Sequence, residues 1–351
     1  MKNKKKNITS LKKFIEKSLY EKNKGYYMSK DPFGHKGDFI TSPNISIFFS
    51  EMIALWIISF WKTLNKPEKF NIVELGGGNG EMVRIILKTF ENFSDINNHF
   101  KIYIFEKSPY LKKIQKEKIK NKNIFWINNF KKIDKGPCIF LANEFFDALP
   151  INQYYKIKNK WYERKVNYSN KKEYQYIDIQ KNIKKVEKKI GYKIAQKQKI
   201  LEISYDAINY MKQISEIIKK NKGGLLIIDY GYEEMKMKNT LRGIRNHKIV
   251  NILSNYKDCD ITYSLSFNFY KMITKKLNLK TSGLTTQGNF LQSLGILKRA
   301  EIVSKNLNFS KKADIYYRIQ KLIGKKFMGE VFKVMLITNK EINFNLGFEA
   351  D

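Results

Sequence analysis

The sequence predicts an α/β fold with a parallel, doubly wound sheet, and three observations support this prediction. Short apolar runs alternate with helical patterns between residues 70 and 142. A glycine-rich turn at Gly76, Gly78 and Gly80 follows the first of these runs directly. Another buried run, 223–229, also ends in an acid and a turn. With 351 residues, the chain is long enough to bury a large core around such a sheet.

The expected elements follow one another simply along the chain. An amphipathic helix over 8–23 and a buried helix over about 46–63 precede the sheet. The core then reads as strand 70–75, helix 80–92, strand 101–106, helix 109–119, strand 123–127, strand 137–142, helix 204–220, strand 223–229 and a last strand 331–337. Residues 152–180 alternate polar and apolar side chains, which predicts a β-hairpin, and the polar stretch 232–265 predicts an irregular lid.

These elements divide the chain into six expected segments. They are an N-terminal helical cap with a cofactor-covering loop (1–66), an α/β core (67–150), a β-hairpin insertion (151–200), a continuation of the core (201–232), a lid and substrate region (233–300), and C-terminal helices with a closing strand (301–351).

The glycine turn indicates the kind of ligand. Glycines at Gly76, Gly78 and Gly80 allow a sharp turn and a close approach of the backbone to a ligand. A dinucleotide fingerprint reads G-x-G-x-x-G/A, and its last position here is the large acid Glu81, which disfavours pyrophosphate. Glu74 suits S-adenosylmethionine, which carries an ammonium and a sulfonium but no phosphate. A glycine-rich turn without a ligand is the alternative.

Two further sites of polar residues follow later strands. Glu106 ends the second strand, where an acid can accept hydrogen bonds from both ribose hydroxyls; an ordinary solvated carboxylate is the alternative. Asn143, Glu144 and Asp147 follow the strand 137–142, at the edge of the sheet where ligands bind. Their carboxylates would hold a cationic acceptor or accept its proton. Alternatively, Asp147 caps a turn and Asn143 satisfies backbone groups.

The net charge and the cysteine positions limit the classes of function that this chain can have. The formal net charge is +34, yet only six of the 67 basic residues are arginines, so we interpret the charge as solvated lysine rather than as a specific nucleic-acid site. Cys138 and Cys259 are far apart, and no metal site is readable beside the three histidines. No stretch predicts a membrane span, and the N-terminus resembles neither a secretory nor a mitochondrial leader. We therefore expect a bacterial cytoplasmic location, with the mitochondrial matrix as the alternative.

Seven motifs in order, over about residues 25–335, resemble the MidA-like family of S-adenosylmethionine-dependent methyltransferases. They are Tyr27-Met-Ser-Lys-Asp-Pro-Phe-Gly-His-Lys-Gly-Asp-Phe-Ile-Thr41, Glu74-Leu-Gly-Gly-Gly-Asn-Gly80, Asn143-Glu-Phe-Phe-Asp-Ala-Leu-Pro150, Ile228-Asp-Tyr-Gly-Tyr232, Thr240-Leu-Arg-Gly-Ile-Arg-Asn-His-Lys248, Thr286-Gln-Gly-Asn-Phe-Leu-Gln-Ser-Leu-Gly-Ile296 and Met328-Gly-Glu-Val-Phe-Lys333. The family includes a mitochondrial complex I assembly methyltransferase that modifies an arginine of a core subunit.

The resemblance implies a class I methyltransferase with a Rossmann-like sheet and roles for particular residues. Gly37, Asp38 and Thr41 belong to a loop that closes over the cofactor; Glu74, Gly76, Gly78 and Gly80 hold its methionine end; Glu106 and Asn143 complete that site; and Glu144 with Asp147 positions a protein arginine. The implied partner is a protein substrate, such as a complex I core subunit or its bacterial counterpart. The oligomeric state, dimer or other, stays open.

The chain also departs from the family pattern. Gly77 stands where the family has proline, and Ser264-Leu-Ser-Phe267 lacks an acid at Ser266, where the family carries one before the Phe. If that acid contacts substrate, the protein is slower, differently selective or reliant on Glu144 alone. Two alternatives therefore stay open: a non-catalytic assembly factor that binds S-adenosylmethionine, and an RNA methyltransferase suggested by the charge.

Overall fold

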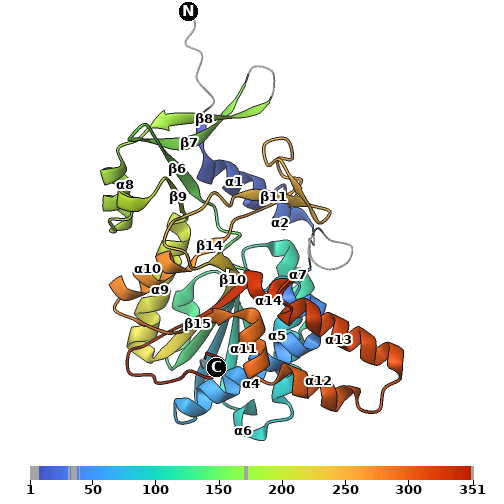
Figure 1. Cartoon of the computed structure of the whole chain (residues 1–351). Helices are drawn as coiled ribbons and strands as arrows, with labels where there is room; N and C mark the ends of the chain where they lie inside the picture. The colour runs from blue at the N-terminus through green and yellow to red at the C-terminus, as the bar shows by residue number, and fades with distance from the viewer. Residues whose placement is uncertain (1–7, 31, 33–37, 39, 170–172, 349–351) are drawn as a thin grey trace, which may run out of the picture.

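A mixed sheet of eight strands forms the centre of the protein (Figure 1). The computed structural model describes residues 8–30, 32, 38, 40–169 and 173–348. The central strands are β2 (Phe70–Leu75), β3 (Phe100–Phe105), β4 (Ile124–Ile127), β5 (Cys138–Asn143), β10 (Gly223–Tyr232), β14 (Leu265–Ser266), β15 (Lys280–Thr286) and β16 (Phe332–Thr338). The buried apolar runs of β2, β3, β4, β5, β10 and β16 match the expected strands closely, because a strand covered on both faces is apolar throughout.

The order of the strands places a crevice at one edge of the sheet. The order is β15-β16-β10-β5-β2-β3-β4, with β14 beside β10. Strands β4, β3, β2, β5 and β10 are parallel, and β16 runs antiparallel to both β10 and β15. The chain leaves β2 towards β3 on one side and returns to β5 on the other. Ligands of open α/β sheets bind at such a reversal of direction, outside the carboxyl ends of the strands.

Helices cover the two faces of the sheet and create two apolar cores. Along β2, Ile72 belongs to one core together with Trp56, and its neighbour Val73 belongs to the other together with Met211. This alternation follows from the two-residue period of a strand.

The helices and short 3-10 turns are α1 (Leu11–Tyr20), α2 (Tyr26–Ser29), α3 (Ser42–Ile45), α4 (Ile47–Thr63), α5 (Glu81–Phe90), α6 (Ser94–Asn97), α7 (Pro109–Lys118), η1 (Phe130–Lys132), α8 (Ile183–Ile190), η2 (Ala195–Lys197), α9 (Tyr205–Asn221), α10 (Phe267–Lys276), α11 (Gln287–Ser293), α12 (Ile296–Ser304), α13 (Phe309–Ile323) and α14 (Met328–Val331).

A five-stranded antiparallel sheet sits above the carboxyl edge of the central sheet in Figure 1. Its strands are β1 (Ile8–Ser10), β6 (Asn152–Ile157), β7 (Lys160–Tyr168), β8 (Tyr174–Gln180) and β9 (Ile200–Ile203). The expected hairpin is therefore part of a larger sheet. The prediction of a helix over 8–23 is wrong at its start, because β1 pairs with β7 and the Ser10 hydroxyl caps α1 by accepting from the Lys13 N–H at 3.2 Å.

The stretch 232–265 is ordered rather than irregular. It contains a three-stranded antiparallel sheet of β11 (Arg242–Arg245), β12 (Lys248–Val250) and β13 (Asp260–Thr262), which we call the lid sheet. Strand β15 was not expected either. Its residues are mostly polar and only partly buried, as suits an edge strand, so they lack the apolar run that marks the central strands.

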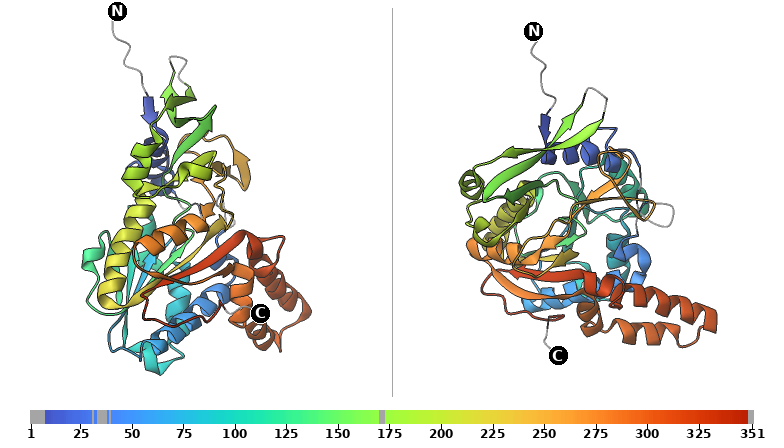
Figure 2. Two further views of the ribbon diagram at one scale, coloured as in Figure 1. Left: turned by 60° about the vertical axis from the view of Figure 1, so that its left-hand side comes forward. Right: turned by 45° about the horizontal axis from the view of Figure 1, so that its top comes forward.

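Two C-terminal helices, α12 and α13, extend sideways from the body and are called the arm (residues 296–323). The right-hand view of Figure 2 shows it projecting beyond the layers of the fold. Its root packs against α3 and α14, close to the carboxyl edge of the sheet. The predicted boundaries of the six segments remain a prediction.

Candidate functional site

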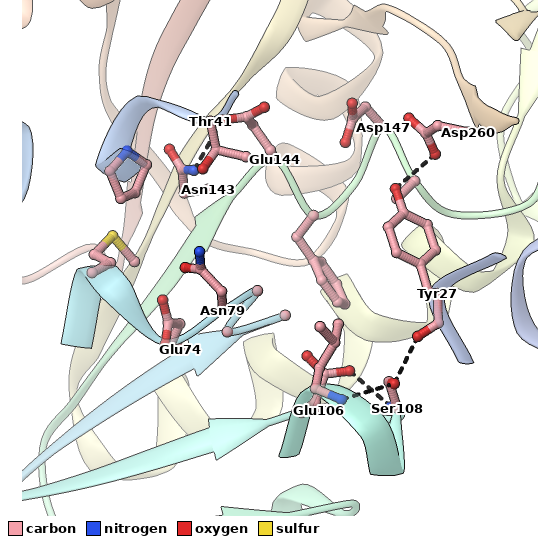
Figure 3. A pocket seen from close by; sticks show the side chains of 18 of the residues that line it. Tyr27, Thr41, Glu74, Asn79, Glu106, Ser108, Asn143, Glu144, Asp147 and Asp260 are labelled. Carbon is pink, nitrogen blue, oxygen red and sulfur yellow. Dashed lines mark hydrogen bonds between the residues drawn. The ribbon is translucent and has the colours of Figure 1, made fainter. Parts of the chain in front are cut away.

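A large cavity opens at the carboxyl edge of the central sheet, where β2, β3 and β5 end (Figure 3). Its empty space is about 1240 Å³, including the solvent at its mouth. The predicted site residues on its wall are Thr41, Glu74, Gly76, Gly78, Glu106, Asn143, Glu144 and Asp147. The tertiary structure thus brings together four stretches of the sequence: Thr41, the glycine turn with Glu74, Glu106, and residues 143–147.

The glycine turn forms one end of the cavity. Gly76 and Gly78 have φ of 71° and 51°, in the left-handed region that favours glycine. A Cβ on Gly76 would also lie 3.0 Å from the Phe145 ring. Gly80, with φ of 80°, does not line the cavity; its missing Cβ leaves room for Ile119, 3.1 Å away, at the end of α7.

Glu74 presents a buried carboxyl group to this end of the cavity. Its Oε2 is buried and has no hydrogen-bond partner among the described residues. Burial, with the nearby Glu106 carboxylate as the lesser cause, raises the pKa of Glu74 to about 8. A buried acceptor without a donor costs free energy, so a ligand that brings a cation or an N–H here would be stabilised.

Glu106 is held on the next strand by a small network. Its Oε1 accepts from the Ser108 N–H at 2.8 Å, and its Oε2 from Gln115 Nε2 at 3.3 Å. Burial raises the pKa of Glu106, and these hydrogen bonds oppose that effect. Gln115 also donates to the Gly78 carbonyl at 2.8 Å and accepts from Trp126 Nε1 at 2.9 Å. Sequence reasoning missed Gln115, which ties the glycine turn to Glu106 from the buried face of α7.

Glu144 occupies a strained position just after β5. Its φ is 51°, uncommon for a residue with a side chain, and its N–H donates to the Ile228 carbonyl at 2.9 Å. Its Oε1 accepts from the Ser42 N–H and from Asn143 Nδ2, both at 3.3 Å. Burial, then the nearby Asp147, raises the pKa of Glu144 to about 8. Asn143 Oδ1 is buried without a partner in the described part of the chain.

Asp147 lies on the loop after Glu144, and a second buried acid fixes that loop. Asp229 Oδ2, on β10, accepts from the N–H groups of Phe146 and Asp147 at 3.1 and 3.2 Å. The Asp147 Oδ2 accepts from the Thr262 hydroxyl at 2.8 Å, whereas its Oδ1 is buried and finds no partner among the residues described. Burial raises the pKa of Asp147 to about 6.

A further carboxyl group on the cavity wall, that of Asp260, was not predicted. It comes from β13 of the lid sheet, and Figure 3 shows it beside Asp147. Its Oδ1 accepts from the Tyr27 hydroxyl at 2.7 Å, and burial raises its pKa to about 7. The available signal was an acid within the short apolar run 259–263, inside a stretch interpreted as an irregular lid.

Of the site residues predicted in the N-terminal loop, one lies on the cavity wall and one anchors the loop. Thr41 lines the cavity, whereas Asp38 does not. Asp38 instead accepts from the Tyr26 hydroxyl and, at 2.8 Å, from the Asn246 N–H in the turn between β11 and β12. It therefore ties the N-terminal loop to the lid sheet. Gly37 lies outside the described residues.

The serine substitutions lie away from this cavity. Ser264 and Ser266 line a separate small cavity, together with Glu202 and Tyr270, and not the large one. An acid at position 266 would therefore face that second cavity. In the described part of the chain, no helix is long and apolar enough to cross a membrane, and no group of His, Cys, Asp and Glu side chains has the arrangement of a metal site.

Residues 52–285 match a family described as "Putative S-adenosyl-L-methionine-dependent methyltransferase". The chain belongs to this family. The zebrafish (Danio rerio) mitochondrial protein arginine methyltransferase NDUFAF7 is 27% identical over 353 residues, which is 94% of this chain and 83% of that protein. The human (Homo sapiens) NDUFAF7 is 28% identical over 357 residues, covering 91% and 77%.

The same fold occurs in a protein from Burkholderia thailandensis crystallised with S-adenosyl-homocysteine. It has a TM-score of 0.81 at 19% identity, covering 97% of this chain and 90% of that protein. The predictions of a MidA-like methyltransferase, of its fold and of S-adenosylmethionine as its cofactor are thereby confirmed. The wall of the cavity fits that cofactor, because the unpartnered Glu74 oxygen suits its positive charges and Gly76 leaves space beside Phe145.

Proposed function

We propose that this S-adenosylmethionine-dependent methyltransferase acts on an arginine of a protein, and that the protein is a core subunit of respiratory complex I or its bacterial counterpart, modified during assembly. Two findings support an arginine as acceptor. The relatives are named protein arginine methyltransferases. Beyond those near the glycine turn, the cavity carries three carboxyl groups, the buried Asp147 and Asp260 and the half-buried Glu144.

The observation that carries the proposal is that these three acids share one cavity, and that one of their oxygens lacks a donor among the described residues. Asp147 Oδ1 has no donor in the described part of the chain, and burial raises the pKa values of Glu144, Asp147 and Asp260 to about 8, 6 and 7. Such a cluster is stabilised by a cation that brings its own donors. A guanidinium brings one positive charge and five N–H donors in a plane, which pair with carboxylates through parallel hydrogen bonds.

Different residues of the cavity would then bind the cofactor and orient the acceptor. When bound, S-adenosylmethionine supplies a methyl group on a positively charged sulfur. Glu74, Glu106 and the glycine turn would hold the cofactor, and Asp147 and Asp260 would fix the plane of the guanidinium. Correct placement of a reacting nitrogen in a site that excludes water supplies much of the rate in such transfers.

Glu144 would accept the proton that leaves the arginine nitrogen. The guanidinium stays protonated at neutral pH, since its pKa exceeds about 12, so this proton must leave as the new bond forms. A carboxylate with a pKa near neutrality is an effective acceptor at that moment. The hydrogen bonds from Ser42 and Asn143 keep its carboxylate on the cavity wall.

The location also belongs to the proposal. We place the enzyme in a bacterial cytoplasm, with the mitochondrial matrix, stated in the names of the relatives, as the alternative. Both cysteines are buried free thiols, as in proteins of reducing compartments. We expect no specific nucleic-acid partner, because lysine rather than arginine supplies the charge.

The test is methyl transfer from radiolabelled S-adenosylmethionine to cell lysate and to the purified complex I core subunit. Wild type should label the subunit, acid hydrolysis should release labelled methylarginine, and Glu144→Ala should remove the label. Glu163→Ala, a buried acid of the antiparallel sheet outside the cavity, is the control and should keep activity. Label that ribonuclease removes would instead identify an RNA methyltransferase. Cofactor binding without any transfer would identify a non-catalytic assembly factor.

A further inference from the structure

Helix α13 has two apolar faces, and only one of them is covered. Ile319 and Leu322 are buried against the body of the protein. Phe309, Tyr316 and Tyr317, spaced by seven and eight residues, share another face of the helix. On that face the three side chains are 87%, 42% and 58% exposed. We call these three residues the outer face of the arm.

This exposure is unusual for a protein surface. Large apolar side chains gathered on one element mark interaction sites more often than solitary exposed ones do. Helix α12 of the same arm adds exposed Leu297, Ile302 and Val303. Aromatic residues are also enriched in the centres of protein interfaces, where they bury much area with few rotatable bonds.

The charge of the arm and its root indicates the kind of partner. Between residues 296 and 326 there are nine basic and two acidic residues. Both acids pair within the arm, Glu301 with Lys298 and Asp314 with Arg318, each at 2.8 Å. A second copy of the chain would bring the same positive charge and be repelled. An apolar surface bordered by acids would be attracted.

Helix α13 is fastened to the element that forms the wall of the cavity. Arg318 Nη1 donates to the Ile45 carbonyl at 3.2 Å, at the end of α3. Residues Thr41, Pro43 and Asn44, in and beside α3, line the cavity. A protein held by the outer face would therefore be held at a fixed position relative to the catalytic cavity.

A second connection runs through a buried glutamine. Gln287 Nε2 donates to the Leu322 carbonyl of α13 at 2.9 Å, and its Oε1 accepts from the Ser42 hydroxyl at 3.2 Å. The Ser42 N–H in turn donates to Glu144 at 3.3 Å. The arm and the proposed proton acceptor thus share one buried chain of hydrogen bonds, which favours the acceptor protein over an unrelated partner.

We propose that the outer face of the arm, Phe309, Tyr316 and Tyr317, docks the protein acceptor through an apolar surface bordered by acidic residues. This proposal rests on the proposed function. Methyl transfer needs only the arginine side chain of the acceptor in the cavity. Docking of the whole acceptor would explain why the enzyme also carries an extended arm with a solvent-exposed aromatic face. Docking outside the cavity would add affinity for the whole acceptor without changing the contacts of its arginine.

The experiment compares two acceptors with the same enzyme variants. The first acceptor is protein in cell lysate, and the second is a short synthetic peptide with one arginine among glycines, used at millimolar concentration. Phe309→Ser combined with Tyr317→Ser should lower the initial labelling rate of lysate protein by about 10-fold or more. Peptide labelling and S-adenosylmethionine affinity should stay within about two-fold.

Two further variants sharpen the comparison. Met235→Ser, which removes a 76% exposed side chain outside the arm, is the matched control and should leave both rates unchanged. Lys311→Glu combined with Lys312→Glu tests the charge, and should lower the rate with lysate protein but not with peptide. Thermal unfolding checks that all variants remain folded.

Each remaining outcome has a definite meaning. If the arm variants label both acceptors as fast as wild type does, the docking proposal alone is overturned. The same holds if the arm variants lose labelling rate equally with lysate protein and with peptide. A wild-type dimer in sedimentation that the arm variants dissociate assigns the face to a second copy. Binding to phosphatidylserine vesicles that the arm variants lose assigns it to a membrane. If wild type labels neither protein nor peptide, the proposed function fails, and the docking proposal fails with it.

Discussion

The two ends of the cavity are built in different ways. The proposed cofactor end comes from short continuous stretches, with Glu74, Gly76 and Gly78 on one strand and turn, and both oxygens of Glu106 accept hydrogen bonds. The acceptor end joins Glu144 and Asp147 with Asp260, more than a hundred residues later, and leaves an Asp147 oxygen without a donor in the described chain. We infer that a fixed ligand would be held by a local motif, whereas the proposed acceptor would meet acids that only tertiary packing keeps together.

The largest effect should come from breaking the cofactor end. Gly76→Val places a side chain at φ of 71° and against Phe145, so S-adenosylmethionine affinity should fall by about 100-fold or more, measured by calorimetry. Gly295→Val is the matched control, because Gly295 has φ of 85° but no atom within 4 Å of its Cβ position. Equal loss of affinity in both variants would show that backbone strain, and not the cavity, was responsible.

Breaking the acceptor end should separate catalysis from cofactor binding. Glu144→Gln keeps the shape of the side chain but removes the proton acceptor, so kcat should fall by about 100-fold or more. The affinity for S-adenosylmethionine should change by less than about three-fold, because Glu74 and Glu106 remain. Single-turnover assays beside calorimetry measure the two quantities. A parallel loss of both would place Glu144 in the cofactor site instead.

The buried acids should also make the stability of the ligand-free protein depend on pH. The pKa of Glu144 is raised from 4.5 to about 8, so its folded form retains the proton while the unfolded form loses it. Its stabilisation is complete below about pH 4.5 and is lost as pH rises towards 8, by about 1.4 kcal/mol per pH unit. Denaturant unfolding from pH 5 to 8 should show a steeper decline for wild type than for Glu144→Gln. Identical slopes would contradict this.

A smaller effect should come from the tyrosine that connects the two ends. Tyr27 donates its hydroxyl to Asp260, and its carbonyl accepts from the Ser108 hydroxyl at 2.7 Å, next to Glu106. Tyr27→Phe should raise the acceptor KM by about 10-fold, because Asp260 loses a charge-assisted hydrogen bond. Tyr154→Phe, a buried tyrosine outside the cavity, should not. A change in kcat without a change in KM would refute a positioning role.

The smallest effect should come from replacing Ser266, which stands where the family carries an acid. Ser266→Ala should leave kcat/KM within about two-fold of wild type, because Ser266 lies on the separate small cavity and its side chain does not cap α10. Steady-state kinetics with the protein acceptor measure this. A loss of ten-fold or more would show that the small cavity communicates with the acceptor end.

Much of the fold followed from local patterns in the sequence. The strands around the glycine turn are buried on both faces, so their apolar runs identify them without knowledge of their partners. Edge strands have no such signature. Strand β15 is mostly polar, and β1, which pairs with β7, lies within a stretch that has helical spacing. Pairing between distant segments is a tertiary property, which a single sequence does not display.

The sequence by itself determined the proposed cofactor end, because its turn needs glycine and its two acids each lie at or beside the end of a buried strand. Only the tertiary structure decided the acceptor end, because Asp260 reaches Asp147 through the pairing of the lid sheet. The tertiary structure also decided which face of α13 stays exposed to solvent. Helical spacing shows that Phe309 and Tyr317 share a face, but burial depends on what the rest of the chain packs against that helix.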